Sequence, residues 1–116
     1  MKLHRIVSRS QEQQAEALLY AAVLKLRSVN EAQAFFQDLC TPAELQALAD
    51  RWSVVPLLQQ GLPYREIHKL TGVSVTTIGR VARCLTAGTG GYRTVASRLQ
   101  SSSAAPSSLT SDPSYG

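Results

Sequence analysis

One stretch decides the fold of this chain: Pro63-Tyr64-Arg65-Glu66-Ile67-His68-Lys69-Leu70-Thr71-Gly72-Val73-Ser74-Val75-Thr76-Thr77-Ile78-Gly79-Arg80-Val81-Ala82-Arg83-Cys84-Leu85. Glycine accepts the left-handed backbone that a tight turn between steeply crossing helices needs, which places the turn at Gly72. Ser74 can cap the second helix, with Thr77 at its third position. The apolar residues expected to face each other across the turn are Ile67, Leu70, Val73, Ile78, Val81 and Leu85. The stretch therefore predicts a helix-turn-helix over residues 63–86.

The second helix of this motif would expose a face suited to DNA. Its N-terminal part is the end that enters the major groove, where Thr76 can bond a base edge or phosphate and Val75 can contact a thymine methyl. The free amides at the Ser74 end can hold a phosphate. His68 stands where a small residue usually packs, so pointing inward it would need a polar partner. The predicted DNA-binding residues are Arg65, His68, Lys69, Ser74, Val75, Thr76, Gly79, Arg80 and Arg83.

Charge is segregated along the chain, whose 116 residues carry a net charge of +4. Residues 11–50 hold six acids against two bases, Lys25 and Arg27. Between residues 65 and 98 the only acid is Glu66, and the bases are Arg65, Lys69, Arg80, Arg83, Arg93 and Arg98. Clustered positive charge is the electrostatic footprint of a nucleic-acid-binding protein. The distribution therefore favours double-stranded DNA as the partner of the second half.

Caps and periodicity predict helices throughout, and no segment alternates as a strand does. Ser10 with Gln13 would open a helix over residues 11–27, whose leucine stripe belongs either to the core or to a dimer seam. Asn30 would cap a short second helix. The strongest start is Thr41-Pro42-Ala43-Glu44, which opens a third helix that ends at Gly61. One or two further turns are expected over residues 92–99, and Pro56 is expected to kink the third helix.

These patterns predict an all-α protein of three parts. A loose arm covers residues 1–9, a helical domain covers residues 10–99, and a disordered tail rich in Ser, Ala and Pro covers residues 100–116. A domain this small buries a limited core by itself. Sharing a core with a second copy is therefore consistent with its length.

Several classes of function find no support in the sequence. The two cysteines, Cys40 and Cys84, lack ligand spacing and are expected to be small buried apolar residues, which excludes a disulfide or zinc framework and fits a reducing cytoplasm. Neither histidine has metal-ligand spacing, so no metal is expected. No apolar run approaches the length of a membrane span, and no signal peptide is expected. No catalytic constellation appears, so the chain is not expected to be an enzyme.

At this point a family resemblance becomes visible. The segment Cys40–Arg51 resembles the opening of the central helix of Trp repressors. The helix-turn-helix stretch, with its run Arg80-Val81-Ala82-Arg83-Cys84-Leu85 and the following Gly90-Gly91-Tyr92-Arg93, more specifically resembles the Trp repressor-like YerC/YecD family. The resemblance covers about residues 10–99. It implies a bacterial, cytoplasmic, intertwined homodimer whose two motifs face successive major grooves of DNA.

The resemblance also implies an effector site and two departures from it. The residues that hold L-tryptophan in Trp repressors carry over onto Thr41, Arg51, Thr77 and Arg80. Val81 stands where those proteins have a glycine that leaves room for the indole, and Cys84 replaces a hydroxyl. We therefore expect no tryptophan cofactor, and the effector stays undefined.

Simpler interpretations of two residues remain open. Arg51 can pair with Asp50 or Glu44 on a solvated helix face instead of holding a ligand. Trp52 can belong to the core instead of forming a ligand platform.

Two hypotheses of function remain. The first is a sequence-specific DNA-binding transcriptional regulator, a repressor by its resemblance, acting as a homodimer on a near-palindromic site. The second is a helical interaction module that binds another transcription component without reading DNA. Arg65, Arg80 and Arg83 discriminate between them, because only the first hypothesis needs their charge for DNA binding.

Overall fold

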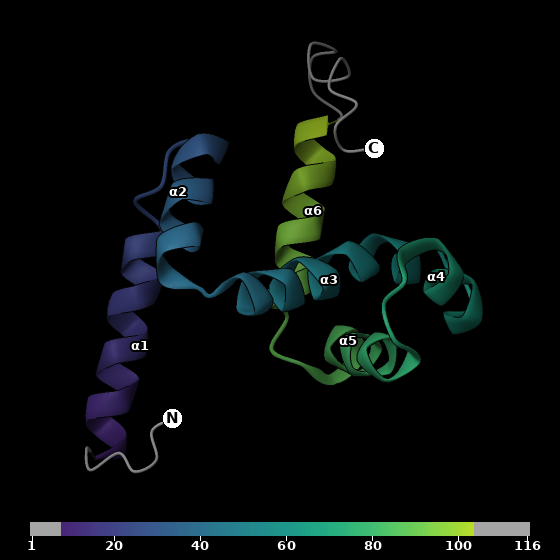
Figure 1. The fold of residues 1–116 in the computed structure, drawn as a ribbon, viewed down its shortest axis with the longest axis horizontal. Helices are drawn as coiled ribbons and strands as arrows, with labels where there is room; N and C mark the ends of the chain where they lie inside the picture. The colour runs from purple at the N-terminus through teal and green to yellow at the C-terminus, as the bar shows by residue number, and fades with distance from the viewer. Residues whose placement is uncertain (1–7, 104–116) are drawn as a thin grey trace. The chain divides into compact units, whose positions relative to one another are not determined.

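The computed structural model describes residues 8–103, which form six helices and no strand (Figure 1). The predicted all-α class is therefore confirmed. Most of the predicted arm (1–7) and tail (104–116) lies outside the described residues. The helices are α1 (Arg9–Val23), α2 (Val29–Leu39), α3 (Pro42–Gln59), α4 (Tyr64–Thr71), α5 (Val75–Ala87) and α6 (Gly91–Ser103).

Side-chain caps fix where the first three helices begin. Helix α3 starts as predicted: the Thr41 hydroxyl accepts the Glu44 amide at 3.1 Å, and the Glu44 carboxylate accepts the Thr41 amide at 2.8 Å. The predicted cap of α1 was wrong by two residues, because Ser8 and Gln11 form the reciprocal capping box in place of Ser10 and Gln13. Each pair has the same spacing, so the sequence pattern alone does not distinguish them.

The cap of α2 was also predicted two residues late. Ser28, and not Asn30, accepts the Glu31 amide at 3.1 Å. Glu31 in turn accepts the Arg27 amide at 2.8 Å, which fixes the entry into the helix. Glu31 is the N3 residue of a Ser28 cap, the position from which an acid reaches back to the turn before the helix.

The chain divides into two compact units, residues 1–45 and 46–116, with the boundary inside α3. The second unit holds a core of buried apolar side chains to which α3, α4, α5 and α6 contribute: Val54, Val55, Ile67, Val73, Ile78, Val81 and Ala96. Trp52, Leu58, Leu85 and Tyr92 pack against this core while partly exposed. The core thus joins the two helices of the predicted motif to α3 and α6.

The first unit has no such core in its described part. None of residues 8–45 is buried. In α1, in α2 and in the segment between them, large apolar side chains face outward, with Leu24 83% and Val29 82% exposed. Phe35 and Phe36 contact each other edge to face at 5.5 Å and are half-buried. The sequence pattern assigns the α1 leucine stripe either to the core or to a dimer seam. The structure shows that these leucines do not form a core within this chain.

Three other expectations differ from the structure. Leu70, predicted to face across the turn, is 61% exposed, and Cys84, predicted to be buried, is exposed. Helix α6 continues through Ser103, beyond the one or two turns predicted over 92–99. None of the helices in the described range is long and apolar enough to cross a membrane.

Candidate nucleic-acid interface

The turn between α4 and α5 has the geometry that the sequence predicts. Gly72 ends α4 with φ of 79°, a left-handed conformation that glycine adopts without strain. Ser74 is extended and its hydroxyl accepts the Thr77 amide at 3.1 Å, which caps α5. Between them, the Thr71 hydroxyl accepts the Val73 amide at 3.0 Å. Every turn residue with a special role is therefore held by a local hydrogen bond or by its own backbone preference.

His68 contributes a clamp that the sequence only partly indicated. Its side chain is exposed on α4, yet Nδ1 donates a hydrogen bond to the Val73 carbonyl oxygen at 2.8 Å. Because a carbonyl only accepts, this contact requires the proton on Nδ1. The polar partner that the sequence analysis required for His68 is thus the carbonyl oxygen of Val73 in the turn. His68 stabilises the turn without entering the core.

Burial of one face of α5 leaves the opposite face for a partner. Ile78 and Val81 are fully buried against Ile67 of α4, which fixes the rotation of α5 about its axis. The predicted DNA-binding residues on α4 and α5 then lie on the exposed side: Arg65, His68, Lys69, Ser74, Val75, Thr76, Arg80 and Arg83 are exposed and Gly79 is half-buried. The structure brings them together on one motif, while their contact with DNA stays a prediction.

Gly79 sits in the middle of α5, where glycine has no conformational role. A Cβ built there would meet only Tyr64 Cε2 at 3.8 Å and Arg83 Nη1 at 3.9 Å, which is ordinary van der Waals contact. No contact within the described residues therefore requires a glycine at position 79. A glycine in a helix interior costs about 0.5–1 kcal/mol relative to alanine. The low profile at Gly79 is available to an external partner that approaches the helix closely.

Three of the four predicted effector residues meet in one pocket of the second unit. Arg51 on α3 and Thr77 and Arg80 on α5 line a pocket of about 400 Å³, together with Val81, Cys84 and Tyr92. We call it the basic pocket. Thr41, the fourth predicted residue, belongs to the first unit, where it caps α3. Val81 is 1% exposed and forms part of the pocket wall.

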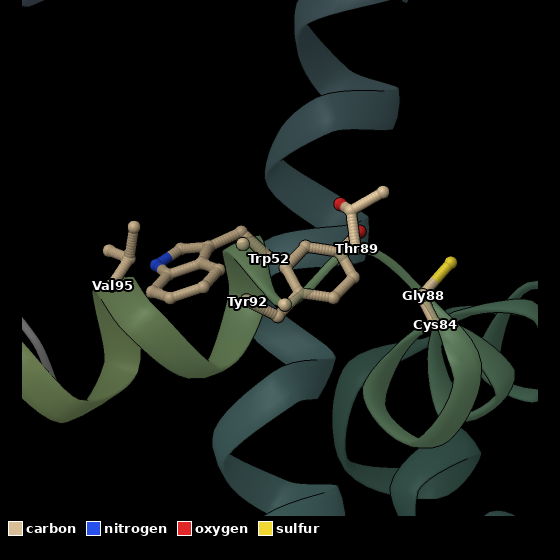
Figure 2. A pocket seen from close by; sticks show the side chains of 8 residues that line it. Trp52, Cys84, Gly88, Thr89, Tyr92 and Val95 are labelled. Atoms are coloured by element: carbon tan, nitrogen blue, oxygen red, sulfur yellow. The ribbon is translucent and has the colours of Figure 1, made fainter.

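A second cavity lies beside the basic pocket, and no sequence pattern indicated it. It has a volume of about 570 Å³ and is lined by Trp52, Cys84, Tyr92, Val95 and the loop 88–91. We call it the apolar hollow. Figure 2 shows the Trp52 indole between Val95 and the Tyr92 ring, with Cys84 on the opposite wall. The Gly-Gly-Tyr-Arg run stands out in the sequence as a family feature, but no periodicity indicates that it borders a cavity.

Trp52 combines features of its two interpretations, a core residue and the wall of a cavity. It packs against the core, and its ring lies 6.1 Å from that of Tyr92 at an angle of 37°. It remains half-buried because its other side faces the apolar hollow.

The described residues contain no cluster of three or more metal-binding side chains.

Two short helices joined by a glycine turn, packed on a longer helix and presenting a basic outer face, define a helix-turn-helix protein. Residues 13–100 match the sequence family described as Trp repressor protein, and the chain belongs to this family. The family's members are DNA-binding regulators, and the chain is not an enzyme.

Individual relatives agree with this assignment. The chain is 40% identical over 82 residues to the uncharacterized protein YerC of Bacillus subtilis, covering 71% of this chain and 79% of YerC. A solved TrpR-like protein from Eubacterium eligens is 38% identical with a TM-score of 0.73, covering 80% of this chain and 96% of that one. A solved structure from Staphylococcus aureus is 33% identical with a TM-score of 0.72, covering 81% of this chain and 96% of that one.

Proposed function

We infer that this protein is a sequence-specific DNA-binding transcriptional regulator of the cytoplasm, acting as a repressor. The observation that carries the proposal is the exposed face of α4 and α5. Arg65, Arg80 and Arg83 are exposed on a motif whose turn is locked internally, and Glu66 is the only acid between residues 65 and 98. Long basic side chains around a recognition helix set its register on the phosphate backbone. Membership of the Trp repressor family supports the same direction.

We further propose that the protein acts as a homodimer. The first unit exposes Leu18, Tyr20, Leu24 and Val29 and buries none of its described residues. Large exposed apolar surfaces on soluble proteins mark interaction sites. Isolated helices shorter than about 12–15 residues are marginal in water, and α2 has 11 residues. A second copy would cover these faces and place two motifs on a near-palindromic operator.

The decisive experiment replaces Arg65, Arg80 and Arg83 by glutamine, singly and together. Each substitution takes away a positive charge that binds phosphate or guanine, so DNA affinity should fall. The slope of log affinity against log salt should decrease by about one for each phosphate interaction removed. Genomic footprinting of the wild-type protein supplies the operator for this titration. Arg27→Gln is the matched control, since Arg27 is an exposed arginine of the first unit and should leave DNA binding unchanged.

The alternative of an interaction module predicts a different result. If the wild-type protein shows no DNA binding even at low salt, or if the triple variant binds as tightly as the wild type, the DNA-binding proposal is wrong. A pull-down partner from the transcription machinery would then be sought on the same helices.

We also propose that the basic pocket binds a small effector other than L-tryptophan. Val81 occupies the place where Trp repressors leave space for the indole, while Arg51, Thr77 and Arg80 keep groups able to bind an anion. Isothermal titration with L-tryptophan should show no heat of binding at micromolar concentration. A micromolar dissociation constant for L-tryptophan would contradict this part of the proposal.

A further inference from the structure

Gly79 leaves a gap in the surface of α5 that the fold itself does not need. Its φ is not positive, and a Cβ at this position would make only ordinary contacts. Glycine in a helix interior is also less stable than alanine. A residue that weakens its own helix, with no compensating contact among the described residues, indicates a requirement that comes from outside the chain.

The side chains next to this gap are apolar. Residues four positions apart are neighbours on a helix, which places Val75 beside Gly79. The Tyr64 ring of α4 borders the same place, with Cε2 3.8 Å from where a Cβ of residue 79 would lie. Three large apolar side chains of residues 63–86 are exposed, and two of them are these neighbours, Tyr64 at 41% and Val75 at 49%. We call the surface between Tyr64, Val75 and Gly79 the glycine notch.

Polar side chains form the outer rim of the glycine notch. Thr76 and Arg83 lie three and four positions from Gly79 on α5, and both are exposed. Arg83 Nη1 is 3.9 Å from the position of a Cβ on residue 79, and the guanidinium has no ion-pair partner among residues 8–103. An arginine in this position is available to a DNA phosphate. The notch therefore combines an apolar floor with a rim that can bind the DNA backbone.

The chemistry of the floor selects among the parts of DNA. Gly79 lies inside α5, where the amide of each residue is bonded to the carbonyl four residues earlier, so the bare backbone offers no donor to a phosphate. It offers instead a shallow apolar surface with the space of one absent methyl group. On the base edges of the major groove, the apolar group is the C5-methyl of thymine. A thymine methyl therefore fits the notch in size and in polarity.

We propose that Gly79 determines the specificity of the recognition helix, because the glycine notch receives the C5-methyl of one thymine in each half-site of the operator. The methyl lies against Val75 and Tyr64, and Arg83 binds a neighbouring phosphate that holds α5 at this depth in the groove. This inference rests on the DNA-binding function proposed above and assigns the base that the helix recognises at its closest approach.

The test crosses a change in the protein with a change in the DNA. The full-length wild type and Gly79→Ala are titrated with the footprinted operator duplex, in which deoxyuridine replaces one thymidine at a time together with its symmetry mate. Uracil differs from thymine only by the missing methyl. We expect one thymine in each half-site at which uracil weakens wild-type binding by about fourfold per half-site, the value of one buried methyl group.

Gly79→Ala should weaken binding to the thymine duplex by about fourfold or more per half-site, because the alanine methyl occupies the notch. On the duplex with uracil at the sensitive position, the same variant should bind as tightly as the wild type, since its methyl takes the vacated space. The effects of the two changes are therefore expected to be non-additive. If the effects add at every thymine of the operator, the proposal is wrong.

Stability separates this role from a structural one. Gly79→Ala should raise the urea midpoint of unfolding, because alanine is the better helix former and its Cβ meets only ordinary contacts. Damage to the fold does not account for a variant that is more stable and yet binds DNA more weakly. A lowered midpoint would show that the chain itself needs the glycine, and it would contradict the proposal.

Gly91→Ala is the matched control. A Cβ at Gly91 also lies in open space, but this residue begins α6, outside the recognition helix. The variant should leave both the affinity for the operator and the response to uracil unchanged. Equal losses of affinity from the two alanines would show that the effect is not local to the notch, which would contradict the proposal.

Two further outcomes keep the notch apart from the regulator itself. If the wild type binds its operator and no thymine methyl affects the affinity, only the assignment of the notch is wrong. The same conclusion follows if Gly79→Ala weakens binding to all duplexes equally and changes the salt dependence, because the phosphate backbone then occupies the gap. If the wild type binds no DNA even at low salt, both the notch and the DNA-binding function are wrong.

Discussion

The two units of the chain use apolar side chains in opposite ways. Residues 46–103 enclose Val54, Val55, Ile67 and Ile78 completely, although some of their apolar side chains, such as Leu70, stay exposed. Residues 8–45 form two helices with side-chain caps and yet contain no fully buried residue. Caps satisfy the ends of a helix but contribute only about 1 kcal/mol each, whereas tertiary packing supplies most helical stability. The buried core of the second unit therefore accounts for its folding, and we expect the first unit to be stabilised by the partner surface proposed above.

The largest effect is expected from charging the outer face of the first unit. The double variant Leu18→Glu with Leu24→Glu should lower the association constant by more than about hundredfold, because each change buries an unpaired charge in the proposed dimer. Analytical ultracentrifugation measures the mass, and circular dichroism should show loss of helix from α1 and α2. Gln13→Glu, a charge at an exposed polar position of α1, is the control. Wild-type protein that sediments as a monomer would contradict the need of the first unit for a partner.

A core variant of the second unit should have the next largest effect. Ile78 is fully buried, so Ile78→Ala should lower the free energy of unfolding by about 2–5 kcal/mol. Leu70→Ala, at an exposed position of the same motif, should change it by about 0.5 kcal/mol or less. Urea unfolding followed by circular dichroism measures both. A large destabilisation by Leu70→Ala would indicate that Leu70 is covered in the assembled protein.

The smallest effect is expected at the cap of the recognition helix. Ser74→Ala removes the acceptor of the Thr77 amide and should cost about 1 kcal/mol of unfolding free energy. Thr76 lies two residues after Ser74, and its side chain makes no hydrogen bond with the described residues, so Thr76→Ala should leave stability unchanged while weakening DNA binding. Thermal unfolding and a DNA titration on both variants separate the two roles. Equal stability of Ser74→Ala and wild type would show that the cap is not needed.

Local signals predicted the motif well. Gly72 and Ser74 act through their own backbone preference and through neighbours within three residues, so their roles can be deduced from the sequence. The cap at Thr41 is determined in the same way. Repeated local patterns were ambiguous, since Ser8 and Ser10 offer the same spacing to a glutamine.

Long-range features could not be deduced in this manner. Leu70 and Thr71 both follow Ile67 at helical spacing, but Thr71 takes the inner side and its hydroxyl donates to the Ile67 carbonyl at 2.7 Å. The clamp from His68 to Val73 depends on the turn bringing a carbonyl to the ring. The inward position of Thr71 and the hydrogen bond from His68 both depend on how α4 is rotated about its axis where it packs against α5.

Caps, glycine and periodicity along the chain were sufficient to predict the all-helical pattern and the helix-turn-helix, and the resemblance of its motifs indicated the family. Spacing along the chain did not indicate that Arg51 meets Thr77 and Arg80, which only the family resemblance implied, and the apolar hollow beside them became known only from the folded arrangement. These groups come from α3, α5 and α6, and their distances depend on the packing of the buried core. Packing is a property of volumes fitted in three dimensions, which spacing along one chain does not encode.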